Sequence, residues 1–301
     1  MTGALDFTRR LENAGIAFLQ HEPLASHTTF KIGGPARWFC EPDSEVKLRE
    51  VLQICRENNI RFYLLGKGSN ILFSDEGFDG AVIHIGAAMA DIRVEGNRIC
   101  AQAGAKLADV CRAAADAGLS GLEFAYGIPG SIGGAVYMNA GAYGGEMRDV
   151  LESASFIAAD GCVGLVPAEE MELGYRSSVF SRRSGCIVSA VLHLQKGAPE
   201  DIRAQMAEFS RRRAEKQPLN FPSAGSTFKR PEGAFAGALI EQCGLRGYSV
   251  GGAAVSEKHC GFVINKGGAT CRDVLELTDR IAEIVKEKTG FTLEKEIRVV
   301  R

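Results

Sequence analysis

The chain has 301 residues, of which 46% are hydrophobic and 24% are charged, so it can form two or three compact units with a sizeable core. Its 35 Lys and Arg nearly balance 37 Asp and Glu, and a net charge of −2 argues against a general nucleic-acid-binding protein. We expect no secretory leader, and no apolar run approaches the roughly 18–20 residues of a membrane span, so no membrane insertion is expected.

The cysteine content indicates a reducing compartment. Nine cysteines are present, the number is odd, and no pair has C-x-x-C spacing. A disulfide framework and a zinc site are therefore not expected. We predict reduced, mostly buried thiols, no metal, and a cytoplasmic location.

Helical and extended patterns alternate irregularly along the chain. A helix is predicted near Asp6 and Glu12, and another carries Leu48, Val51, Leu52 and Cys55 after a cap at Asp43 or Ser44. Further helices are predicted over 107–115, 200–216 and 274–285, stopped by Gly118, Pro218 and Gly290. Strands are predicted over 61–65, from 136 onward, and over 153–158, 186–194, 263–265 and 291–299. This order predicts an α+β fold with a boundary near 196–199.

A first glycine-rich turn follows the predicted strand 61–65. It reads Gly66-Lys67-Gly68-Ser69-Asn70, and small residues in succession allow backbone N–H groups to converge on an anion such as phosphate. It is not a Rossmann dinucleotide motif, because Ile71 stands where the third glycine is needed. An ordinary tight turn remains an alternative.

A second, richer glycine run favours a ligand. It reads Tyr126-Gly127-Ile128-Pro129-Gly130-Ser131-Ile132-Gly133-Gly134 and continues at Asn139-Ala140-Gly141-Ala142-Tyr143-Gly144. Ordering so many glycines is entropically expensive. We therefore favour close approach of a large flat or charged ligand over a flexible loop.

A third segment has the spacing of penicillin-recognising serine enzymes. Ser226 to Lys229 is S-x-x-K, and Lys288-Thr289-Gly290 is K-T-G. Pro231 would obstruct the helix that S-x-x-K requires, and K-T-G falls at a helix end instead of on a strand. This interpretation is rejected on context. Arg176 and Glu296 are, from spacing alone, ordinary surface residues, although Arg176 could offer a guanidinium fork to a carboxylate.

Together these segments resemble one family, the UDP-N-acetylenolpyruvoylglucosamine reductases, also called UDP-N-acetylmuramate dehydrogenases. The likeness runs from His27-Thr28-Thr29-Phe30-Lys31-Ile32-Gly33-Gly34 through both glycine runs to Tyr175-Arg176-Ser177, Gly225–Lys229, Gly251–Ala254 and Glu294-Lys295-Glu296-Ile297. The resemblance implies a vanillyl-alcohol-oxidase-type FAD-binding domain (1–196 with 291–301) and an inserted α+β substrate-binding domain (197–290). The FAD-binding domain would have two α+β subdomains, about 1–75 with 291–301, and 76–196.

The resemblance also implies a reaction and the residues for it. NADPH would reduce FAD, which would reduce UDP-N-acetylglucosamine enolpyruvate to UDP-N-acetylmuramate in peptidoglycan precursor synthesis. Arg176 would hold the substrate carboxylate, Glu296 would lie beside it as a protonated donor, and Ser226 would protonate the enolate carbon. Substrate contacts would come from Tyr175, Lys229 and His259. Cofactor contacts would come from Gly66, Lys67, Gly68, Ser69, Asn70, Tyr126, Gly127, Ile128, Pro129, Gly130, Ser131, Gly133, Gly134, Asn139 and Gly141.

No tyrosine occurs between Tyr175 and Tyr248, so the chain is similar to the family form that lacks a loop with a lid tyrosine. Two other functions are alternatives to this reaction. A FAD-dependent oxidase would use the glycine runs but not Ser226, and a nucleotide-sugar-binding protein would be colourless when purified.

Overall fold

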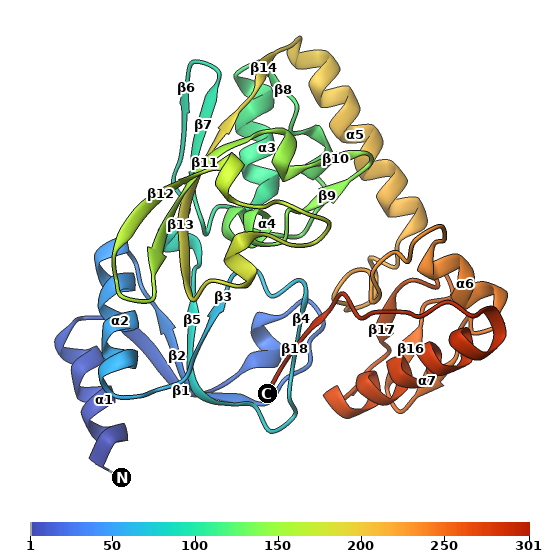
Figure 1. Ribbon diagram of the computed structural model, residues 1–301, viewed down its shortest axis with the longest axis horizontal. Coiled ribbons are helices and arrows are strands. Elements are labelled where there is room, and N and C mark those ends of the chain that lie inside the picture. Colours follow the sequence, from blue (N-terminus) through green and yellow to red (C-terminus); the bar gives the residue numbers. More distant parts are fainter. Residues whose placement is uncertain (1) are drawn as a thin grey trace. The chain divides into compact units, whose positions relative to one another are not determined.

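A computed structural model describes residues 2–301, and the chain divides into two compact units (Figure 1). Unit 1 runs to Gln20 and then takes Trp38–Lys67 and Gly80–Arg212; unit 2 comprises His21–Arg37, Gly68–Asp79 and Arg213–Arg301. Helices and strands mix in the order expected for an α+β fold. The finer division predicted from the sequence, with an inserted domain at 197–290, stays a prediction.

A four-stranded sheet with two helices begins the chain. Its strand order is β1-β2-β5-β3, with β3 and β5 parallel. The bounds are Ala17–Pro23 for β1, Pro35–Glu41 for β2, Phe62–Leu65 for β3 and Phe78–His84 for β5. The helices are α1 (Thr2–Asn13) and α2 (Glu45–Glu57). Ser44, not Asp43, caps α2, because its hydroxyl accepts a hydrogen bond from the Lys47 amide.

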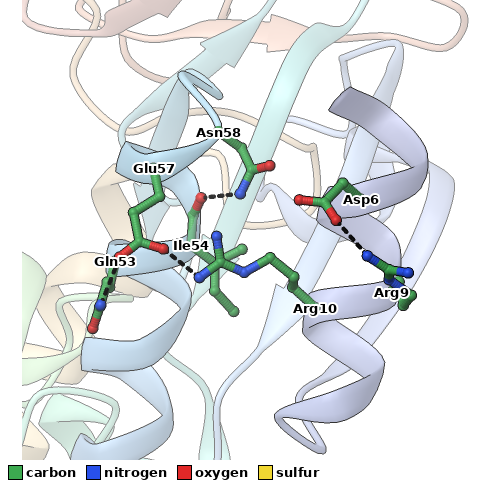
Figure 2. Close-up of polar contacts among 7 residues, drawn as sticks. All are labelled: Asp6, Arg9, Arg10, Gln53, Ile54, Glu57 and Asn58. Carbon is green, nitrogen blue, oxygen red and sulfur yellow. Dashed lines mark hydrogen bonds and ion pairs between the residues drawn. The ribbon is translucent and has the colours of Figure 1, made fainter. Parts of the chain in front are cut away.

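Polar contacts join the outer faces of α1 and α2 (Figure 2). Arg10 of α1 pairs with Glu57 of α2, and Gln53 donates to the same carboxylate at 2.7 Å. The hydrogen bond from Gln53 is the largest cause that lowers the pKa of Glu57, and the hydrogen bond from Arg10 is the second. Asn58 donates to the Ile54 carbonyl at 2.9 Å and so closes the end of α2. Because the contacts of Arg10 and Gln53 with Glu57 are exposed, the buried apolar faces of both helices hold the pair together more than these contacts do.

An antiparallel five-stranded sheet forms the rest of unit 1. Its order is β12-β11-β13-β7-β6, and α3 and α4 both contact it. The strands are β6 (Ile92–Glu95), β7 (Arg98–Gln102), β11 (Leu151–Ala158), β12 (Val163–Pro167) and β13 (Gly185–His193). Smaller pairs are β8 (Leu119–Ser120) with β14 (Gln195–Lys196), and β9 (Gly141–Ala142) with β10 (Gly145–Glu146). The helices are α3 (Leu107–Asp116), α4 (Ile132–Tyr137) and α5 (Pro199–Lys216), which continues into unit 2.

The strand predicted from residue 136 onward is wrong. Val136 lies in α4, where the Ala135 amide donates to the Ser131 carbonyl at 2.8 Å. The β-branched residue favoured a strand locally, but packing of Ile132 and Val136 in the unit 1 core selected a short helix instead.

Unit 2 has its own core around a three-stranded sheet of order β15-β16-β17. Its elements are β4 (Ile71–Phe73), α6 (Ala236–Gln242), β15 (Ser249–Val250), β16 (Ala253–Val255), β17 (Val263–Asn265), α7 (Cys271–Thr289) and β18 (Arg298–Val300). α7 ends at Gly290 in the left-handed conformation, as predicted. The final strand is shorter than predicted: only β18 is regular, pairing parallel with β4, and most of 291–297 has no strand pairing.

Six short 3-10 helices complete the secondary structure of the described residues: η1 (Leu24–His27), η2 (Ala87–Met89), η3 (Glu123–Ala125), η4 (Met147–Asp149), η5 (Ala168–Glu170) and η6 (Val179–Ser181). All nine cysteines are free thiols, and Cys162 alone among them is exposed. Among residues 2–301, no helix combines the length and apolar character needed to cross a bilayer.

Candidate active site

Two glycines and one serine from the predicted cofactor runs come together in unit 1, and we call them the Ser131 cluster (Gly66, Ser131 and Gly134). A Cβ on Gly66 would lie 2.7 Å from the Ser131 Oγ, and a Cβ on Gly134 would lie 3.7 Å from it. The Ser131 hydroxyl is buried, yet it has no hydrogen-bond partner within the described chain. Such an orphan is costly and usually marks a missing ligand or water. Because the glycines beside this unsatisfied hydroxyl have no side chains, a polar group of a bound cofactor could approach it.

The second glycine run also serves the fold. The amides of Ile132 and Gly133 donate to the carbonyls of Ala105 and Ala103, each at 2.9 Å. A Cβ on Gly133 would lie 2.9 Å from the Ala103 Cβ, so this glycine permits close packing. These two amides are therefore not available to an anion, and the expected convergence of backbone donors holds for fewer residues than the sequence suggested.

The first glycine run spans both units. Gly66 and Lys67 belong to unit 1, whereas Gly68, Ser69 and Asn70 belong to unit 2. Gly68 has φ +61°, and a Cβ there would lie 2.2 Å from the His27 carbonyl oxygen. Only glycine fits this position, and the reason is backbone packing within unit 2.

Arg176 occupies a strained turn in unit 1. Ser177 N donates to the Gly174 carbonyl at 3.2 Å, which makes residues 174–177 a β-turn, and Arg176 has φ +52°. Its guanidinium donates to the Gly141 carbonyl at 3.2 Å and lies 5.1 Å from the ring centre of Tyr175, whose side chain is half exposed. A bulky residue in this conformation costs about 1–3 kcal/mol and is enriched at functional sites.

Ser226 and Glu296 are brought onto adjacent segments of unit 2. The Glu296 amide donates to the Thr227 carbonyl at 2.8 Å, and Phe228 forms a bridge with Lys295. Ser226 is exposed and Glu296 is half-buried. The sequence neighbour of Ser226 thus holds the backbone of Glu296, although the two segments are far apart in the chain. This pairing could not be deduced from spacing.

Asn70 holds the other side of the Glu296 peptide. Its side-chain amide donates to the Glu296 carbonyl at 3.2 Å, and the Arg298 amide donates to the Asn70 carbonyl at 3.0 Å. The Glu296 backbone is therefore fixed on both sides. The sequence predicted Asn70 only as a cofactor contact and missed this role.

The predicted substrate contacts Lys229 and His259 lie near Ser226 in unit 2. Lys229 pairs with Glu294, and its amide donates to the Glu294 carbonyl at 2.8 Å. His259 Nδ1 accepts from the Gly261 amide at 3.0 Å, and the Gly261 carbonyl accepts from the Thr227 amide at 2.9 Å. Burial lowers the pKa of His259. The imidazole is thus neutral at pH 7, with its proton on Nε2.

One aromatic pair was missed by the sequence analysis. Tyr143, at the tip of the β9–β10 hairpin, stacks on Phe209 of α5 with ring centres 4.5 Å apart and planes 2° apart. Tyr143 has φ +54°, followed by Gly144 at +91°. Tyr143 lies in the same hairpin whose Gly141 carbonyl accepts from Arg176. Only its position in the glycine run could have drawn attention to it.

Comparison with known proteins assigns both parts of the chain. Residues 217–300 match the model described as UDP-N-acetylenolpyruvoylglucosamine reductase, C-terminal domain, and residues 36–164 match the model described as FAD binding domain. The UDP-N-acetylenolpyruvoylglucosamine reductase of Syntrophomonas wolfei is 50% identical over 280 residues, 93% of this chain and 94% of that protein. That of Lachnoclostridium phytofermentans is 50% identical over 284 residues, 93% of this chain and 92% of its own length.

A solved structure agrees with these matches. The crystal structure of UDP-N-acetylenolpyruvylglucosamine reductase from Thermus caldophilus aligns with a TM-score of 0.81 at 36% identity, over 95% of this chain and 99% of that one. These comparisons confirm the predicted α+β fold with a FAD-binding domain of the vanillyl-alcohol-oxidase type. With half of its residues identical to those of such a reductase over 93% of its length, the chain belongs to the UDP-N-acetylenolpyruvoylglucosamine reductase family.

Proposed function

We propose that this chain reduces UDP-N-acetylglucosamine enolpyruvate to UDP-N-acetylmuramate, with NADPH as the reductant and FAD as its cofactor. Family membership supports the reaction. The observation that carries the assignment of residues is the hydrogen bond from the Glu296 amide to the Thr227 carbonyl, which holds Ser226 and Glu296 on adjacent segments. UDP-linked precursors and NADPH are cytoplasmic metabolites, so the proposed location is the cytoplasm.

FAD, when bound, supplies hydride transfer from NADPH to the enolpyruvyl group. The Ser131 cluster would hold a polar group of this cofactor, because its hydroxyl needs a partner and its glycines leave space for one. The other proposed contacts come from the two glycine runs, at 66–70 and 126–134, from the backbone of Asn139, and from Gly141. The proposed domains remain 1–196 with 291–301 for the cofactor and 197–290 for the substrate.

Arg176 would stabilise the charge that develops when the enolpyruvyl group accepts a hydride. Negative charge then spreads from the carbon onto the neighbouring carboxylate, and a fixed cation lowers the barrier most where that charge appears. The guanidinium offers two parallel donors to a carboxylate. Its strained turn supports this role, because such strain persists where a side chain must be held in one place.

Ser226 would give the proton that completes the reaction. An enolate carbon is basic enough to take a proton from a positioned hydroxyl, although serine is a weak acid. Glu296 would donate a hydrogen bond to the substrate carboxylate in its neutral form. Tyr175, Lys229 and His259 are the proposed further substrate contacts.

Stopped-flow measurement of the two half-reactions tests the proposal. Ser226→Ala should leave flavin reduction by NADPH intact and slow reoxidation by the enolpyruvyl sugar by about 10²–10⁴-fold, the usual contribution of a general acid. Ser223→Ala is the matched control. Ser223 accepts a hydrogen bond from the Thr29 hydroxyl through its backbone carbonyl, which the substitution keeps.

Three results would contradict parts of the proposal. A Ser226→Ala enzyme within threefold of wild type would remove Ser226 from proton transfer. Rapid consumption of NADPH with oxygen and without the sugar would instead indicate an oxidase. Purified protein that is colourless and binds no FAD would favour a nucleotide-sugar-binding protein.

A further inference from the structure

The turn that carries Arg176 has a conformation that its own residues do not favour. Gly174 and Ser177 exchange both backbone hydrogen bonds, at 3.0 and 3.2 Å. Within this turn Arg176, the third residue, has positive φ and Tyr175, the second, does not. That is the pattern of a type II turn, where glycine or asparagine is preferred at the third position. Surrounding groups must therefore stabilise it.

Asn139 supplies a side-chain hydrogen bond to this turn. Its side-chain amide donates to the Gly174 carbonyl at 3.0 Å and to Glu146 Oε2 at 2.9 Å. Its Oδ1 accepts from the Arg148 amide at 2.9 Å. Asn139 is fully buried, and both of its amide protons are used within the chain. The side chain is therefore committed to protein contacts.

The contacts of Asn139 and Arg176 connect the 174–177 turn to the β9–β10 hairpin at two points. Glu146 pairs with Gly141 in the β9–β10 hairpin, and the Gly141 carbonyl accepts from the Arg176 guanidinium at 3.2 Å. Asn139 thus connects the backbone of the 174–177 turn to Glu146 of the hairpin. The Arg176 side chain connects the same turn to Gly141 of the hairpin. The Gly174 carbonyl that Asn139 binds is the same atom that closes the turn. Movement of this carbonyl would move Arg176.

We propose that Asn139 is a positioning residue that fixes the Arg176 guanidinium for its substrate carboxylate, and that its side chain does not contact the cofactor. The inference rests on the proposed role of Arg176. A guanidinium must meet a carboxylate in one plane, and a displacement of about 1 Å can slow a positioned reaction by about 10²-fold. Loss of the Asn139 donors should therefore reduce kcat for the sugar more than it changes KM for NADPH.

The test uses two variants of the complete flavoprotein. Asn139→Gly removes both donors while tolerating the positive φ of this residue, which is 42°. Asn139→Asp keeps the shape but sets a carboxylate against Glu146, and it carries the test if the glycine variant does not fold. Each should slow flavin reoxidation by the enolpyruvyl sugar about 10–100-fold. Flavin reduction by NADPH should stay within twofold of wild type.

Asn58→Ala is the matched control. Asn58 lies in the same unit and also donates to a backbone carbonyl, that of Ile54 (Figure 2), and among residues 2–301 its side chain makes no hydrogen bond to the 174–177 turn. It should lower the thermal midpoint without changing either half-reaction. A comparable loss of sugar reduction in this control would overturn the inference, because general destabilisation would then explain the effect.

A double-mutant cycle separates this inference from the proposed function. Arg176→Gly removes the guanidinium and suits the turn. If Asn139 acts through Arg176, the double variant should be no slower than Arg176→Gly alone. Multiplying effects would overturn the inference, as would loss of flavin binding in both Asn139 variants. If Arg176→Gly itself leaves sugar reduction unchanged, the proposed role of Arg176 is wrong and the inference falls with it. If Arg176→Gly is inactive but the Asn139 variants reduce the sugar at the wild-type rate, the inference alone is overturned.

Discussion

Replacing Ser131 by alanine should have opposite effects on the apoprotein and on cofactor binding. The Ser131 hydroxyl is buried without a partner in the described chain, and an unsatisfied buried group costs roughly 1–3 kcal/mol. Its removal should therefore stabilise the apoprotein, by about 1 kcal/mol. If the hydroxyl binds FAD, the same change loses one hydrogen bond of about 1.5 kcal/mol. FAD should then bind about tenfold more weakly.

Gly66→Ala provides the steric half of the same prediction. The new Cβ would lie 2.7 Å from Ser131 Oγ but 3.9 Å from Ser131 Cβ. The first distance forces a displacement, whereas the second is an ordinary contact. Ser131→Ala should therefore relieve the strain of Gly66→Ala, and the double variant should bind FAD no more weakly than Gly66→Ala alone.

The assay is titration of apoprotein with FAD, followed by flavin fluorescence, together with thermal unfolding of the apoprotein. Ser178→Ala is the control, because Ser178 is equally buried but donates to the Tyr137 carbonyl at 2.7 Å. This change should destabilise the apoprotein by about 1–2 kcal/mol and leave FAD affinity unchanged. A Ser131→Ala apoprotein that is less stable than wild type and binds FAD equally well would refute the reasoning.

Three further outcomes are expected. Asp75 accepts hydrogen bonds from the first two amides of α7, at 2.6 and 3.0 Å, so Asp75→Ala should lower the free energy of unfolding by about 1–2 kcal/mol. The control Asp79→Ala, at an exposed ion pair, should change this free energy by less than about 0.5 kcal/mol. Urea denaturation measures both. Burial lowers the pKa of His259, so the unfolded chain binds its proton more readily and stability should fall as pH drops below about 6.5; a thermal midpoint that falls equally in His259→Gln would contradict this. Burial raises the pKa of Cys111 to about 12, so iodoacetamide at pH 8 should label Cys162 and leave Cys111 unlabelled in peptide mass spectra of the folded protein.

Much of the fold was predictable because its signals are local. Apolar spacing predicted α2 and α7, and Gly290 marked the end of α7 as expected. The prediction failed where packing overrode local preference. Val136 entered a short helix in the unit 1 core, and most of the predicted strand over 291–299 is irregular because only its end pairs with β4.

Some features of the candidate site were likewise predictable from the sequence, and others were not. Ordered glycine runs and the Ser226, Arg176 and Glu296 segments indicated the family from the sequence by itself, because motif order is a property of the chain. Only the tertiary structure decided that the Glu296 backbone rests against the residue after Ser226, that the Ser131 hydroxyl has no hydrogen-bond partner within residues 2–301, and that Asn139 is fully engaged. Each of these depends on hydrogen bonds between distant segments, and no local periodicity encodes which segments will meet.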